Sequence, residues 1–336
     1  MKMQTYRSIK GINLDILKSS VMNLSIKKWL PRRKSRFGRP SYNPISLFLG
    51  HLLKIRELFQ YDTTLEEKLH ENNDFRKFCG FNKENIPSHD TFSRFLRNLS
   101  EITILKILKK IDEHLVSIGM FDKDELALDA TDILSNGRNR HNLDPDAGYG
   151  YKTDKERFHG YWVYFVSGTT SEIARSSWVL PANIHQSNGA MILFNHLEKR
   201  DLCSASVMTM DGAFDDKKCY SRNIELGLIP AISYNHKKAK IKHFNYLRKS
   251  NWRKIALGRE GVRIRNLSTK KRSSVERYQS TFKDILKGRV VPVRGLIKVR
   301  KYVLFACILS QLIGKVNWIK IHKRNRFSLI KLNKFI

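Results

Sequence analysis

The sequence has few cysteines, no apolar leader and no long apolar run. Its cysteines form no C-x-x-C pair and have no histidine at metal-ligand spacing; they are Cys79, Cys203, Cys219 and Cys307. This pattern argues against a cysteine-based metal site and favours ordinary thiols in a reducing, intracellular compartment. Residues 1–10 lack the apolar core of a signal peptide, and the most apolar run, residues 302–313, is too short to span a bilayer. We therefore expect a soluble protein with a buried C-terminal helix.

Acidic residues are also scarce. The 336 residues include 63 Lys and Arg but only 31 Asp and Glu, so the formal net charge is +32. So large an excess repels itself in a compact fold and makes a polyanionic partner, above all nucleic acid, the leading inference. The alternative is a generally basic surface, such as that of a ribosome-associated protein or a protein from a biased genome. The length allows about two domains.

Residues 1–42 are expected to form one or two amphipathic helices followed by a basic arm. The arm, residues 31–40, holds five positive charges and two prolines, so it cannot be one regular element. It is either an arm that lies along phosphates or a solvated linker. A second basic segment, an insertion at about residues 235–270, interleaves aromatic residues with cations and is either a backbone-tracking surface with base stacking or a solvated face. A basic tail, residues 315–336, ends the chain.

The pattern between residues 43 and 120 is helical almost throughout. Ser88 is expected to cap a helix that has Asp90 in its first turn and leaves Arg94 and Arg97 facing outward. Two short helices, a turn containing Gly80 and this capped helix favour a helix-turn-helix-like DNA reader, with both arginines as DNA contacts. A plain helical bundle would show the same spacing.

Short strands dominate the expected domain over residues 121–314. Apolar and β-prone runs predict strands over residues 125–133, 161–167, 177–180, 205–210 and 228–233, with helices over 188–197 and 215–226. Residues 135–155 resemble an exposed loop. This order predicts an α/β fold in which helices flank a mixed sheet.

Three carboxylates stand out in this domain. Asp129 and Asp211 each occur at the far end of a strand-like run, although an aspartate there is, taken alone, more often a turn or N-cap residue. Glu276 lies in a predicted helix with Arg272 and Lys283 on the same face, which alone is also the pattern of a structural salt-bridge ladder. Together, two strand ends and one helix can supply the hard oxygen ligands of a site for two divalent metals.

Taken in order, these segments resemble the insertion-sequence transposases of the DDE class over about residues 43–313. The matching pieces are Leu128-Asp-Ala-Thr131, Met210-Asp-Gly-Ala-Phe214 and the helix Arg272-x₃-Glu276-x₆-Lys283. Thr269 stands where the helix signature of that class has Tyr, and Tyr278 or Tyr246 is a candidate to replace it. No single piece is specific, but the three in order are.

The resemblance implies a ribonuclease-H-like catalytic domain in which Asp129, Asp211 and Glu276 bind two Mg²⁺ ions, with Mn²⁺ as a substitute. Arg272 and Lys283 would bind phosphates near the scissile bond. It also implies cleavage at terminal inverted repeats and strand transfer into target DNA, by a homodimer on DNA in the cytoplasm, associated with the nucleoid.

Two neighbouring acids, Asp132 and Asp215, are the alternatives to the aspartates of this assignment. Two other functions remain open at this point. One is a catalytically inactive or domesticated DNA-binding relative, and the other is an RNA-binding or ribosome-associated basic protein without a metal site.

Overall fold

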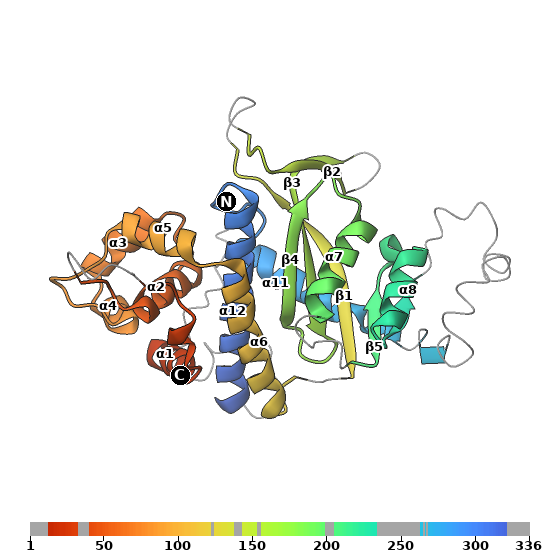
Figure 1. Ribbon diagram of the computed structural model, residues 1–336, viewed down its shortest axis with the longest axis horizontal. Coiled ribbons are helices and arrows are strands. Elements are labelled where there is room, and N and C mark those ends of the chain that lie inside the picture. Colours follow the sequence, from red (N-terminus) through yellow and green to blue (C-terminus); the bar gives the residue numbers. More distant parts are fainter. Residues whose placement is uncertain are drawn as a thin grey trace, which may run out of the picture. The chain divides into compact units, whose positions relative to one another are not determined.

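The computed structural model describes residues 13–32, 40–121, 124–137, 143–152, 156–198, 205–233, 263–264, 266 and 268–320 (Figure 1). Most of the predicted basic arm, most of the basic insertion and most of the basic tail therefore lie outside the described residues. The chain divides into two compact units. The first comprises Met1–His114, Thr281–Gly288 and Arg300–Ile336, and the second comprises Leu115–Ser280 and Arg289–Val299.

The first unit is helical. It contains α1 (Leu14–Met22), η2 (Ile26–Lys28), α2 (Pro44–Arg56), α3 (Asp62–Glu71), α4 (Asn73–Cys79), α5 (His89–Asn98), most of α6 (Glu101–Ser117) and the greater part of α12 (Leu296–Lys320). Its core includes a ring cluster in which His51 of α2 stacks on Phe95 and lies close to Phe92 and Phe305. The predicted buried C-terminal helix is confirmed, and it is α12. The sequence assigned α12 to the catalytic domain, whereas its contacts place most of it with the N-terminal helices.

Local signals in the sequence set the ends of several helices in the first unit. Pro44 occupies the first turn of α2, and the side chain of Asn43 accepts the Ile45 N–H at 3.1 Å. Gly80 ends α4 with a φ of 78°, a left-handed conformation that glycine adopts without strain. Ser88 does precede α5, but its side chain makes no capping hydrogen bond. The Glu66 carboxylate instead accepts the His89 N–H at 2.7 Å, a tertiary cap that local sequence could not predict.

The second unit is built on a six-stranded mixed sheet. Its strands are β1 (Glu125–Leu134), β2 (Gly148–Tyr151), β3 (Arg157–Gly168), β4 (Ala174–Pro181), β5 (Val207–Met210) and β6 (Ile229–Ile232), in the order β2-β3-β1-β5-β6 with β4 also paired to β3. β1 runs antiparallel to β3 and parallel to β5, and β5 runs parallel to β6. The predicted α/β fold with a mixed sheet flanked by helices, preceded by a helical N-terminal region, is confirmed.

Helices cover both faces of this sheet. α7 (Gln186–Glu198) packs on β3 and β4, and α8 (Lys217–Glu225) packs on α7 and β6 (Figure 1). On β3, Tyr164 lies against Gly189 of α7, whereas the next residue, Phe165, packs edge-to-face on Tyr278 of α11 (Ser273–Asp284). Because successive strand residues point to opposite faces, α7 and α11 lie on opposite sides of the sheet.

One strand was missed. The interval 135–155 was expected to be an exposed loop, but it contains β2, and Asp144 within it is 1% exposed. The sequence of β2, Gly-Tyr-Gly-Tyr, contains two glycines, which are depleted in strands, so local propensity argues against it. Pairing with β3 overrides that propensity. Within the parts of the chain that the structure describes, we find no helix of sufficient length and apolarity to cross a bilayer.

Candidate active site

Strand register brings the two candidate aspartates together. In the parallel pair of β1 and β5, Leu128 is the partner of Met210, so Asp129 and Asp211 directly follow two paired residues of adjacent strands. The sequence placed both at strand ends, which is correct only for Asp211. β1 continues to Leu134 because β3 pairs with it along its whole length, so Asp129 lies in mid-strand, at the point where β5 stops.

Asp129 is buried among atoms that only partly compensate its charge. The residue is 8% exposed, its Oδ1 accepts the Ala130 N–H at 2.9 Å, and its Oδ2 lies 3.5 Å from Nη1 of Arg272. Burial and the neighbouring Asp211 carboxylate raise the pKa of Asp129 to about 7, against the opposing effects of Arg272 and the Ala130 N–H. A carboxylate held this far from its ordinary range is typical of a functional site, although structural ion pairs can do the same.

Asp211 is held by the turn that follows β5. Its Oδ1 accepts the Ala213 N–H at 2.8 Å and so caps the short helix η5 (Gly212–Phe214). Burial raises the pKa of Asp211, and the Ala213 N–H and the Arg272 charge oppose that rise. The same turn that fixes the side chain therefore also offsets part of its desolvation.

Arg272 links two of the candidate carboxylates. It ends η7 (Thr269–Arg272), directly before α11, and its Nη2 lies 2.7 Å from Oε1 of Glu276 while Nη1 faces Asp129. The charge of Glu276 also acts on both aspartates. Asp129, Asp211, Glu276 and Arg272 thus form one interacting group, which we call the carboxylate cluster.

The other signature positions behave differently. Lys283 lies seven residues beyond Glu276 on α11, with a half-buried side chain, in the segment that belongs to the first unit. Thr269 begins η7. Tyr278, one candidate for the missing signature tyrosine, is 1% exposed and packs on Phe165, so it is a core residue. The other candidate, Tyr246, lies outside the described residues.

A contact set that the sequence did not predict holds the segment before α11 on the sheet. Glu125, the first residue of β1, lies 2.6 Å from Nζ of Lys271 and accepts a hydrogen bond from the Ser268 hydroxyl at 3.2 Å. Thr209 of β5 donates its hydroxyl to the Ser268 carbonyl at 3.3 Å. These contacts fix where η7 lies and therefore where Arg272 points. We call the set the Glu125 latch.

The geometry separates one of the two alternative aspartates, Asp132, from the carboxylate cluster. Asp132 is three residues beyond Asp129 on the same strand, so it points to the opposite face of the sheet, where its Oδ2 lies 3.3 Å from Nζ of Lys152. Asp215 ends η5, and its backbone N–H bonds to the Gly212 carbonyl.

The donor set of the carboxylate cluster matches a divalent cation in chemical type, but its arrangement is not that of a formed metal site. Three carboxylates provide the hard oxygen atoms that such a cation prefers, and burial, followed by the neighbouring Asp211 carboxylate, raises the pKa of Asp129. In the described residues, no three His, Cys, Asp or Glu side chains are arranged as a ready metal-binding group. The Arg272 guanidinium lies beside Asp129 and Glu276, so a cationic side chain already contacts these oxygen atoms.

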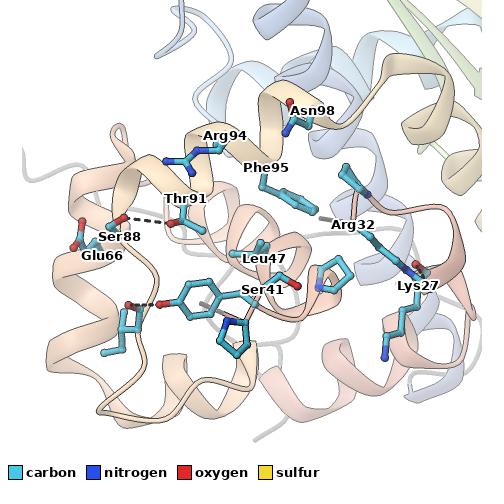
Figure 2. Close-up of a pocket in the computed structure, with 15 residues that line it drawn as sticks. Lys27, Arg32, Ser41, Leu47, Glu66, Ser88, Thr91, Arg94, Phe95 and Asn98 are labelled. Atoms are coloured by element: carbon cyan, nitrogen blue, oxygen red, sulfur yellow. Dashed lines mark hydrogen bonds between the residues drawn. The ribbon is translucent and has the colours of Figure 1, made fainter. Parts of the chain in front are cut away.

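The two candidate DNA-contact arginines of the first unit are both exposed on α5. Arg94 lines a groove of about 860 Å³, and Lys27 and Arg32 are also among its lining residues (Figure 2). Arg97 is not among the residues that line it.

Comparison with known proteins gives matches to transposase family models and similarity to solved structures, among them that of a transposase. Residues 7–98 match the model described as Transposase domain (DUF772), and residues 120–312, more than half of the chain, match the Transposase DDE domain model. Among solved structures, the chain is similar to a cryo-EM structure of a piggyBac transposase synaptic complex with hairpin DNA, at 14% identity and a TM-score of 0.41, over 97% of this chain and 76% of that chain. No curated protein matches the chain.

Proposed function

Since the chain belongs to the DDE transposase family, we propose that it cuts DNA at the ends of its own insertion sequence and joins those ends to target DNA. The observation that supports this chemistry is the carboxylate cluster, in which parallel strand register sets Asp129 beside Asp211 and Arg272 connects them to Glu276. Membership of the family is also what the sequence motifs predicted, and that prediction is confirmed.

Asp129, Asp211 and Glu276 are the residues that would hold the divalent ions used by this family, which we propose to be two Mg²⁺ with Mn²⁺ as a substitute. Such ions, when bound, activate the attacking oxygen and stabilise the leaving 3′-oxygen of a phosphodiester. Arg272 would then exchange its carboxylate partners for a phosphate oxygen, since a guanidinium binds either anion in a bidentate manner. Lys283 would bind a second phosphate as a point charge.

The DNA partner in this proposal includes the terminal inverted repeats and the target. The first unit would contact DNA through α5, where Arg94 and Arg97 are exposed, and a nucleoid-associated location would follow from that contact. We propose a homodimer as the active form, because two ends of one element must be joined together. The net charge of +32 per chain supports a polyanionic partner for the monomer and for the homodimer alike.

The test is a nicking assay on a plasmid that carries the gene with its genomic flanks, in the presence of Mg²⁺. Asp211→Asn should abolish nicking at the flanks while DNA affinity stays at the wild-type value. Asp132→Asn is the matched control, because it changes an aspartate of the same sheet on the opposite face, and it should nick normally. Wild-type protein that binds the flanks but never nicks them would favour the inactive, DNA-binding relative instead.

A further inference from the structure

The groove on the first unit, which we call the α5 groove, has one wall made by a single helix face. Ser88, Thr91, Arg94 and Asn98 line it at intervals of three or four residues, which places them one above another along α5 (Figure 2). Its opposite wall comes from Lys27 of η2, from Arg32 and from the residues just before α2. The floor contains the buried side chains of Leu47 and Phe95.

The charge of the groove is positive on both walls. Lys27 and Arg32 lie on one side and Arg94 on the other, and all three side chains are exposed. Arg32 donates to the Lys27 carbonyl at 3.3 Å, which holds its guanidinium beside that wall. Glu66 is the one acid among the lining residues, and its Oε2 lies 2.8 Å from Nδ1 of His89. A concave surface with cations on both walls concentrates positive potential and attracts an anionic chain.

The uncharged lining groups suit the same ligand. Ser88 and Thr91 carry hydroxyls, and Asn98 carries an amide, all on the α5 wall. Hydroxyl, amide, lysine and arginine groups are the side chains that commonly bind phosphate and sugar oxygen atoms of DNA. The side chains therefore fit a phosphodiester backbone better than they fit an apolar peptide or a small apolar ligand.

The α5 groove limits which DNA surface the polar face of α5 can contact. A recognition helix reads sequence by placing that face in the major groove, which is about 12 Å wide. Here the face that carries Thr91, Arg94 and Asn98 lies opposite a wall that includes Arg32 and Tyr42, so it is confined to a groove within the unit. Another exposed position on α5, Asp90, carries a negative charge that disfavours DNA.

We propose that the α5 groove binds the sugar-phosphate backbone of one DNA strand, so that α5 positions the DNA without reading its bases through Thr91, Arg94 and Asn98. The proposal rests on the proposed function in that DNA is the substrate, and it names the part of that substrate which the first unit holds. It departs from the helix-turn-helix-like reader that the sequence favoured.

The experiment measures the affinity of the full-length protein for two unrelated 30-base-pair duplexes over a range of salt concentrations, without divalent metal. Each phosphate contact contributes about 0.9 to the slope of log K against log salt. Arg94→Ala and Arg32→Ala should each lower that slope by about 1 and weaken binding equally on both sequences. Arg94→Lys should retain the slope, since it keeps the charge. Glu66→Gln should tighten binding, because it removes the acid of the groove.

Two comparisons make the result specific. Lys110→Ala changes an exposed cation of α6 that does not line the groove, and it should leave the slope at the wild-type value. Arg97→Ala tests base reading from the outer side of α5. A loss confined to one of the two sequences in Arg94→Ala would overturn the proposal, because it would mean base readout. Wild-type affinity and slope in both Arg94→Ala and Arg32→Ala would overturn it as well.

The outcomes also separate this proposal from the proposed function. If the wild-type protein binds and nicks its flanking DNA while the groove variants bind normally, only the groove proposal fails. If the wild-type protein binds neither duplex, the result contradicts the proposed function, because DNA is then not the substrate. The last measurement uses single-stranded oligothymidine of the same length. If the groove holds one strand, Arg94→Ala should weaken binding of this single-stranded DNA as well.

Discussion

Replacing Asp129 by Asn should stabilise the metal-free protein at high pH. The pKa of Asp129 is raised from 3.8 to about 7 by burial and by the Asp211 carboxylate. Between pH 4 and pH 7 the folded protein therefore holds a proton that the unfolded chain has lost, and the free energy of unfolding falls as pH rises through that window. Above pH 7 the full cost is on the order of 4 kcal/mol, at about 1.36 kcal/mol for each tenfold change in the protonation equilibrium.

Asparagine cannot ionise, and its side-chain oxygen can still accept the Ala130 N–H, so Asp129→Asn avoids that cost. It also loses the contact with Arg272, so we expect a net gain of roughly 2–4 kcal/mol at pH 8. The gain should vanish near pH 4, where Asp129 is protonated. Urea denaturation in EDTA at both pH values measures this, with Asp132→Asn as the control that should show no gain. Equal stability of Asp129→Asn and the wild-type protein at pH 8 would refute the reasoning.

Three further variants test contacts around the site. Arg272→Gln removes the guanidinium beside two carboxylates and should cost about 1.5–3 kcal/mol of metal-free stability, measured by denaturation at pH 8. Glu125→Ala opens the latch on the segment before α11, and should slow nicking by up to about 100-fold with unchanged DNA affinity in a binding titration. Asp144→Ala leaves the buried Tyr161 hydroxyl and the half-buried N–H groups of Gly295 and Asp146 without their acceptor and should lower the unfolding free energy by roughly 2–5 kcal/mol. A loss below about 0.5 kcal/mol would mean that water replaces the carboxylate.

The sequence predicted the strands of the second unit wherever apolar runs were long enough to be unambiguous. β3 and β4 were found as short cores of longer strands, because polar residues interrupt the apolar pattern near their N-terminal ends. These residues are Arg157 and His159 in β3 and Arg175 and Ser176 in β4. β2 was missed because a strand of alternating glycine is stabilised by its partner. Propensity is local, whereas pairing depends on residues distant in the chain.

The sequence identified the residues of the candidate site, but it did not predict the side-chain contacts between them. Asp129, Asp211 and Glu276 were selected by residue type and order, yet the contact between Arg272 and Asp129 spans 143 positions and depends on how η7 lies on the sheet. The same limit applies to Glu66, which caps α5 from α3. Contacts of this kind follow from tertiary register, which a single sequence does not specify.

The register of η7 on the sheet has a simple physical origin. Glu125 and Asp129 are four residues apart on β1, so they point to the same face at a separation of about 13 Å. Two consecutive cations, Lys271 and Arg272, contact these two acids. A shift of η7 by one residue would carry both cations away from their partners at once, and a one-residue slip of β1 would turn both acids to the other face. The two ion pairs therefore favour one register, the one in which Arg272 contacts both Asp129 and Glu276.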